Sequence, residues 1–239
     1  LPHQSIGIDG TYRFLADRLQ LSAFAAMTMN EKRLRSYYDA KRCDVSGPDE
    51  GVNGVRDMVF GTTSKLRMRY VGSSVESDTT FRQVDCRFDP SVGFATRDDV
   101  RIAQNETGYT WRGLDGLVTR AEISQSAGAV LEDSSGRYLG FGTQANAEID
   151  IANRFEIGGT FGYAEDVVDE AFDLPNDKVI EPGRYGGIQA SLSTSSTGRR
   201  NPYGGFSYRL NQGFYGGASH TVSGRIGGAI GSHLRLSSR

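Results

Sequence analysis

The sequence predicts an all-β protein: an antiparallel up-and-down meander that forms a membrane-type β-barrel or a large part of one. Many segments alternate apolar and polar residues with the period of two that strands have. Glycine is abundant (31 residues) and proline scarce (6), which favours many strands over a disordered chain. No run approaches the roughly eighteen apolar residues of a membrane helix. The apolar fraction of 37% is low for a soluble domain with a large core, but usual for barrel strands.

The first segments predict a hairpin followed by a long surface loop. Residues 6–14 and 19–27 each place their apolar side chains on one parity, and Asp17-Arg18 forms the turn between them. Residues 30–56 are polar and rich in charge, with several glycines near their end. So long a connection between strands is typical of a surface loop.

The strand pattern returns at residues 62–71 and again at 73–88. In the first of these segments, three apolar residues alternate with three basic ones. One face of this strand is therefore expected to meet water and the other an apolar environment. The apolar residues are Leu66, Met68 and Tyr70, and the basic ones are Lys65, Arg67 and Arg69.

The remaining chain continues the meander, for a total of about eleven or twelve strands. The longest clean alternation covers residues 117–127, and residues 138–151 and 155–163 predict a hairpin around Asn153-Arg154. The acidic residues 165–170 are interpreted as a loop, and residues 174–184 as turn-rich. Further strands are expected from residue 188 to about 192 and over residues 203–210, 214–228 and 232–237.

Residues 88–101 predict a tight corner between two strands. Asp89-Pro90 cannot continue a regular strand, because proline has no N–H and restricts the residue before it. Gly93 permits a backbone geometry that other residues resist. Phe88 and Phe94 are expected to anchor this corner at a membrane interface, where aromatic side chains are favoured.

The same segment carries a family resemblance. Phe88-Asp89-Pro90-Ser91-Val92-Gly93-Phe94-Ala95-Thr96-Arg97 resembles a pattern close to Phe-Asn-Pro-Glu-Val-Gly-Phe-x-x-Arg. That pattern occurs in a bacterial family of unknown function that joins a family-9-like carbohydrate-binding module to a C-terminal outer-membrane β-barrel. Three downstream segments are also similar to the family: Phe172 with Val179-Ile180-Glu181-Pro182-Gly183-Arg184-Tyr185, Arg199-Arg200-Asn201-Pro202, and Gly213-Phe214-Tyr215-Gly216-Gly217.

The resemblance implies a location in the bacterial outer membrane, contact with its lipid and a link to glycan handling. It also implies one β-barrel domain over residues 1–239, as a fragment from which the binding module and the first barrel strands are absent. The terminal aromatic strand that usually closes such a barrel is missing from the family pattern here. Sugar binding by the module therefore does not transfer to residues of this chain.

Composition and spacing give no signal for other kinds of chemistry. Lysine plus arginine (27) nearly balances aspartate plus glutamate (29), so no nucleic-acid-binding surface is expected. Cys43 and Cys86 lack zinc-site spacing, and one disulfide or two free thiols both remain open. No metal, cofactor or catalytic constellation is expected. The acidic pairs Asp98-Asp99 and Glu165-Asp166 are adjacent, whereas glycoside hydrolysis needs carboxylates that face each other across a substrate.

The leading hypothesis is a porin-like outer-membrane barrel that serves as a pore or a surface anchor. Its arginine-rich parity would line a polar lumen, with Arg67, Arg69, Arg120, Arg209 and Arg225 as the candidates. The rival from another class is a soluble β-rich protein that binds carbohydrate through aromatic side chains. The candidates for that role are Tyr37, Tyr38, Trp111 and Tyr215. A hydrolase ranks lowest, and the oligomeric state is left open.

Overall fold

The structure is a computed structural model that describes residues 4–31, 58–88, 99–113, 117–152, 154–174, 178–196, 203–230 and 234–238. Within these ranges the regular elements are strands, apart from the single 3₁₀ turn η3 at Phe214–Gly216. No helix in the part of the chain so described is long and apolar enough to cross a bilayer. The all-β fold is therefore confirmed.

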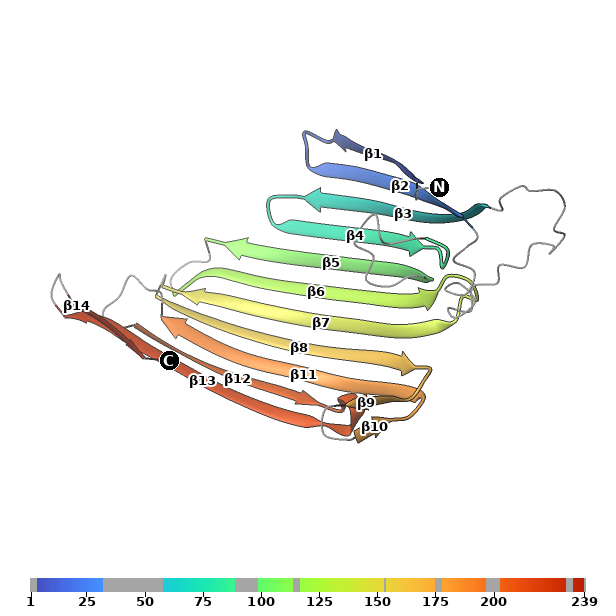
Figure 1. Ribbon diagram of the computed structural model, residues 1–239. Coiled ribbons are helices and arrows are strands. Elements are labelled where there is room, and N and C mark those ends of the chain that lie inside the picture. Colours follow the sequence, from blue (N-terminus) through green and yellow to red (C-terminus); the bar gives the residue numbers. More distant parts are fainter. Residues whose placement is uncertain are drawn as a thin grey trace, which may run out of the picture. The chain divides into compact units, whose positions relative to one another are not determined.

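Twelve described strands form one antiparallel sheet in which sequence neighbours pair, as Figure 1 shows for β7 and β8. This confirms the up-and-down meander and the expected number of strands. The order along the sheet is β1 (Gln4–Phe14), β2 (Leu19–Glu31), β3 (Met58–Val71), β4 (Val75–Val84), β5 (Val100–Arg112), β6 (Val118–Glu132), β7 (Tyr138–Ile151), β8 (Phe155–Val168), β11 (Gly183–Ser196), β12 (Tyr203–Gln212), β13 (Ala218–Ile230) and β14 (Leu234–Ser238). A separate two-stranded hairpin, β9 (Phe172–Leu174) and β10 (Lys178–Ile180), interrupts the series between β8 and β11.

The chain divides into two compact units. The first comprises Leu1–Tyr70, Asp78–Gln104 and Ala129–Leu139, and the second comprises Val71–Ser77, Asn105–Gly128 and Gly140–Arg239. In the first unit, the registers of β1, β2 and β3 place apolar residues opposite one another, which gathers them on one face. We call this the apolar face of the first unit; it carries Ile6, Ile8, Tyr12, Leu21, Leu66 and Met68, all exposed.

The second unit has the same division into two faces. Ile157 of β8 pairs with Ile149, and Phe161 pairs with Ala145 and Ala190, whereas Thr160 between them lies on the opposite side. The apolar face of the second unit carries Ile149, Ile157, Phe161, Leu192, Phe206, Val222 and Ile226, all exposed. The opposite, polar face of this unit carries serine, threonine, asparagine, glutamine and charged side chains.

A small buried cluster lies in the first unit. Val84, Phe88, Val100 and Leu139 pack together there, with Ala26, Ile102 and Val130 against them. The chain reaches this cluster by crossing Gly61, where an added Cβ would lie 2.2 Å from the backbone of Arg87 and Phe88. Glycine is therefore required at position 61 for close approach of the backbone. Phe88, expected at a membrane interface, is instead 9% exposed and belongs to this cluster.

Two local interpretations of the sequence were wrong. The segment expected to be a loop from residue 165 belongs to β8 as far as Val168, and it pairs with β11 from Gly183 onward. The acidic side chains are accommodated because Glu165 meets Arg184 at 3.4 Å and Asp166 accepts from the Tyr215 hydroxyl at 3.1 Å. The strand expected from residue 214 begins only at Ala218, since η3 precedes it and Tyr215 takes a positive φ of 50°.

Candidate functional site

The five arginines predicted to line a lumen lie on the polar sides of their strands. In the first unit, Arg67 and Arg69 are opposite Ser22 and Gln20 of β2. In the second unit, Arg209 is opposite Ser191 and Thr221, and Arg225 is opposite Gly205. Arg120 joins them because its side chain meets carboxylates of the polar face. Each unit therefore keeps its candidate arginines away from its apolar face.

These arginines differ in their partners. Arg67 donates from Nε to Asp78 Oδ1 at 2.9 Å, and Arg120 donates from Nη1 to Glu148 Oε1 at 3.0 Å. In the part of the chain that the structure describes, neither Arg209 nor Arg225 has a carboxylate partner. Arg209 and Arg225 are thus the guanidinium groups on the second unit's polar face that are available to a solute.

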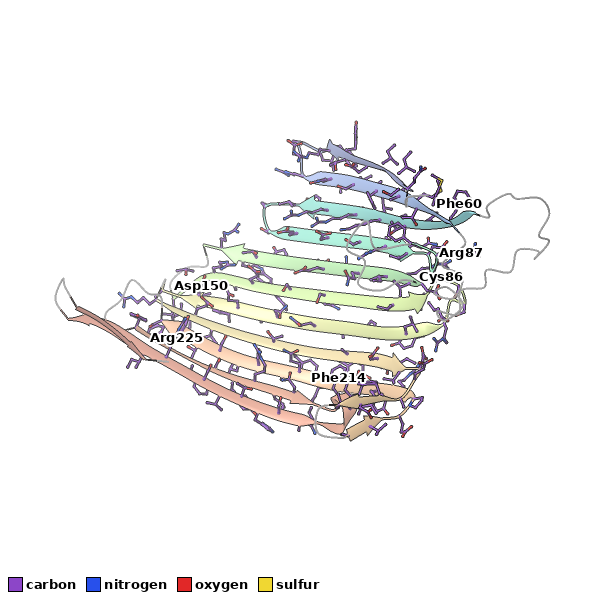
Figure 2. All side chains as sticks on the ribbon, viewed as in Figure 1. Phe60, Cys86, Arg87, Asp150, Phe214 and Arg225 are labelled. Carbon is purple, nitrogen blue, oxygen red and sulfur yellow. The ribbon has the colours of Figure 1, made fainter. Side chains whose placement is uncertain are left out.

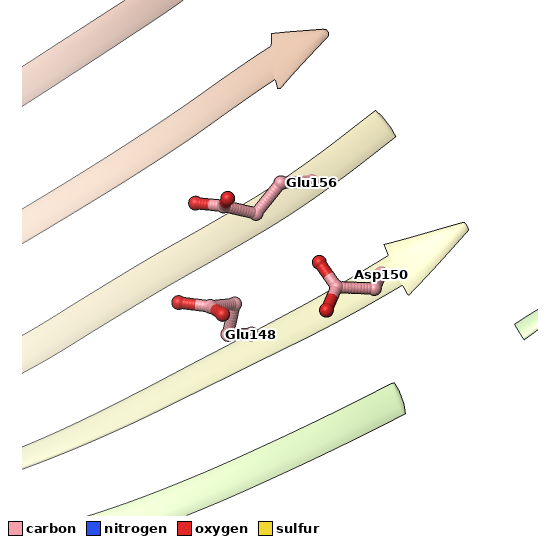
Figure 3. Close-up of side chains that lie close together, drawn as sticks. All are labelled: Glu148, Asp150 and Glu156. Atoms are coloured by element: carbon pink, nitrogen blue, oxygen red, sulfur yellow. The ribbon is translucent and has the colours of Figure 1, made fainter. Parts of the chain in front are cut away.

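Three carboxylates gather beside Arg120. Glu148 and Asp150 come from β7 and Glu156 from β8, and one oxygen of each lies within 4.8 Å of the others (Figure 3). Carboxylate oxygens suit a hard cation such as Ca²⁺. Here Arg120 already contacts Glu148 and lies 3.5 Å from Asp150 Oδ2, and so supplies counter-charge. Glu156 is the member of this acidic cluster without an ion-pair partner among the described residues.

The polar face of the second unit also contains a recess of about 670 Å³ beside the acidic cluster. Its lining includes Glu156 from β8, Tyr203 from β12 and Arg225 from β13. The remaining polar side chains are hydroxyls: Ser193 and Thr194 with Ser195, Ser207 and Ser223. Register explains the arrangement, because Glu156 pairs with Ser195, Ser195 with Gly205, and Gly205 with Arg225. Residues from four neighbouring strands therefore form one row on one face.

Tyr215, a candidate glycan contact, belongs to an aromatic cluster. Its ring centroid lies 5.2 Å from that of Tyr185 and 5.6 Å from that of Phe172 in an edge-on contact. Lys178 Nζ donates to the Tyr215 carbonyl, and the Tyr215 hydroxyl donates to Asp166 Oδ2. Burial and the hydrogen bond to Asp166 raise the pKa of the Tyr215 phenol above its usual value. Tyr215 therefore ties η3 to β9, β10 and β11.

Trp111 is arranged differently, since its side chain is 41% exposed. Its ring centroid lies 4.3 Å from that of Tyr109, two residues earlier on β5. Thr110, between them, reaches Glu122 Oε2 at 3.4 Å, so Tyr109 and Trp111 point to the side opposite the acidic residues. This is the side on which β7 and β8 carry Ile149 and Ile157.

Several predicted residues lie outside the described part of the chain. They are Tyr37, Tyr38, Cys43, Asp89, Pro90, Gly93 and Phe94. The proposed corner and the Cys43–Cys86 disulfide are therefore still predictions. Cys86 itself is buried.

Sequence reasoning missed the acidic cluster and the recess. The alternation over residues 138–151 did indicate that Glu148 and Asp150 share one parity. It did not give the registers that bring Glu156 beside them or align Arg225 with Glu156 across four strands. Register depends on the pairing of distant segments, which the alternation within one strand does not specify.

No protein-family model, curated protein or solved structure matches the chain.

Proposed function

We propose that this chain forms the wall of a bacterial outer-membrane β-barrel that acts as a pore or a surface anchor. The observation that carries the proposal is the division of each unit into an apolar and a polar face. Ile8 is 74% exposed in the first unit, and Phe161 and Val222 are 58% and 66% exposed in the second. Exposed apolar surface on this scale is rare on soluble monomers and marks contact with lipid or a partner.

The distribution of burial supports the same function. Only seven apolar residues are buried in the described part of the chain, and Val84, Phe88, Val100 and Leu139 account for most of them. A soluble domain of this size would bury far more apolar surface to offset its conformational entropy. In a membrane barrel, lipid covers the apolar face, and the polar face meets water in the lumen.

Strand length is also suited to a bilayer. β6 has 15 residues, and β7, β8 and β11 have 14 each. About nine to eleven residues of a tilted strand cross the hydrocarbon core. A closed barrel would satisfy the backbone N–H and C=O groups without water, which is the condition for strands to cross lipid. The link of this barrel to glycan handling rests on the family resemblance.

Vesicle flotation and planar-bilayer conductance test the proposal. We expect the full chain to float with phosphatidylethanolamine–phosphatidylglycerol vesicles and to resist extraction by alkaline carbonate. Discrete conductance steps would identify a pore, and membrane insertion without steps would identify an anchor. A chain that stays monodisperse in buffer without detergent and does not float would overturn both.

The second candidate is a soluble β-rich protein that binds carbohydrate, and it is favoured by one observation. The exposed Trp111–Tyr109 ring pair offers an aromatic surface of the kind on which a sugar ring stacks. This candidate predicts that Trp111→Ala abolishes glycan binding in plain buffer. The barrel proposal instead predicts that Trp111 contacts lipid.

A further inference from the structure

The recess on the polar face of the second unit has opposite charges at its two sides. Glu156 on β8 and Arg225 on β13 lie on one register row, with Ser195 and Gly205 between them. Neither charge has an ion-pair partner in the parts of the chain that the structure describes. Figure 2 labels Arg225, and Figure 3 shows Glu156 beside Glu148 and Asp150. Two unpartnered opposite charges therefore line one recess.

The row sets the length of a matching solute. Glu156 and Arg225 are three strand spacings apart, or about 14 Å between their Cα atoms. An extended chain of three residues spans about 10 Å, and the two side chains cover the remainder. The recess volume of about 670 Å³ lies within the usual range for small-molecule sites.

The surface between the two charges suits peptide groups. Gly205 has no side chain, and an added Cβ there would lie 3.2 Å from Arg225 Nε, so the guanidinium extends over open backbone. Ser193, Ser195 and Ser207 supply hydroxyls that both donate and accept hydrogen bonds. Ser207 and Ser223 are joined at 2.7 Å, which leaves each with further bonding capacity.

We propose that this recess binds a short peptide with free termini, of about three residues. Its carboxylate lies against Arg225 in a charge-assisted hydrogen bond, and its ammonium lies against Glu156. A simple anion is disfavoured because Glu148, Asp150 and Glu156 gather at one side with Arg120 as their cation. A neutral sugar would leave both recess charges without a counter-charge.

This inference rests on the proposed function in one respect: the polar face must be reached by water, as a lumen is. Binding and conductance are nevertheless separate measurements on the same preparation. Peptide binding without conductance would support the site and overturn the pore. Conductance without peptide binding would support the pore and overturn the site.

Isothermal titration calorimetry on the full chain in detergent micelles tests the site, with trialanine as the probe. We expect saturable binding of trialanine and at least about tenfold weaker binding of N-acetyl-trialanine and of trialanine amide, each of which lacks one terminal charge. Maltotriose, which is hydroxylated and uncharged, is expected not to bind. This series needs no variant, so misfolding cannot obscure its outcome.

Variants then assign the two ends of the peptide. Arg225→Gln and Glu156→Gln are each expected to weaken trialanine binding at least about tenfold. Arg209→Gln is the matched control, because Arg209 lies on the same face, lacks a carboxylate partner among the described residues and does not line the recess. Equal affinity of all three variants and the parent protein for trialanine would overturn the proposal. So would equal binding of trialanine and its blocked forms, binding of maltotriose in preference to them, or no binding at all.

Discussion

Arg120 on β6 donates from Nη1 to Oε1 of Glu148 on β7 at 3.0 Å, and the same nitrogen lies 3.5 Å from Oδ2 of Asp150. One guanidinium thus serves two carboxylates on the neighbouring strand. A third carboxylate, Glu156 on β8, lies within 4.8 Å of these two. The contact holds like charges together on the polar face, and its removal is expected to destabilise this part of the sheet.

Arg120→Gln is expected to lower the free energy of unfolding by about 1 kcal/mol or less, because the arginine side chain is 39% exposed and solvent screens the pairs. Urea titration in detergent micelles measures the change. The effect should shrink at high salt. Arg209→Gln, which removes an arginine without a carboxylate partner among the described residues, is the control. Equal effects of both substitutions would contradict the role given to Arg120.

Gly61→Ala is expected to destabilise the first unit by about 2–3 kcal/mol, since its Cβ would lie 2.2 Å from backbone atoms of Arg87 and Phe88. Gly10→Ala is the matched control: an added Cβ at Gly10 meets nothing within 4 Å. Chemical unfolding of both variants measures the difference. If Gly61→Ala were as mild as Gly10→Ala, the crossing of residues 87 and 88 over β3 would be wrong.

The pKa of the Tyr215 phenol, which burial and Asp166 raise, gives a prediction at high pH. Because its folded pKa lies above the unfolded value, its contribution to stability is complete below about pH 10 and is lost as the pH rises through the folded pKa. Spectroscopic titration of phenolate should show one late-ionising tyrosine that is missing in Tyr215→Phe. Tyr12→Phe, in the other unit, should retain it. Identical titration curves for the two variants would exclude the Tyr215–Asp166 contact.

Adjacent residues on β11 allow a direct comparison of the two faces. Leu192 is 55% exposed on the apolar face, and Ser193 lies on the polar face. In lipid vesicles, Leu192→Arg is expected to reduce stability by about 2–4 kcal/mol if that position lies at mid-bilayer. Ser193→Arg should cost less than about 1 kcal/mol, because water solvates it. A mild effect of Leu192→Arg would instead favour a water-exposed face.

The alternating pattern predicted the strands and their two faces because the side-chain period of a strand is local. The five lumen arginines therefore lie on the polar sides of their strands, as expected from parity. Composition around residues 165–168 did not reveal a strand. Their acidic side chains find Arg184 and Tyr215, and these contacts come from segments distant in sequence.

The recess could not be predicted for a related reason. Whether Glu156 and Arg225 share a row depends on the registers of three strand pairs, and a shift of one residue in any pair would move a side chain to the other face. Phe88 shows the opposite error. Its proximity to a proline corner indicated an interface anchor, whereas the crossing at Gly61 brings it into a buried cluster.

The fluorescence of Trp111, the only tryptophan in the sequence, tests most directly whether the apolar face meets lipid. In vesicles made with bromine-labelled acyl chains, we expect strong quenching of its emission, a blue shift relative to the unfolded chain and little quenching by aqueous iodide. Emission that is quenched by iodide and unaffected by the brominated lipid would contradict the membrane-barrel account.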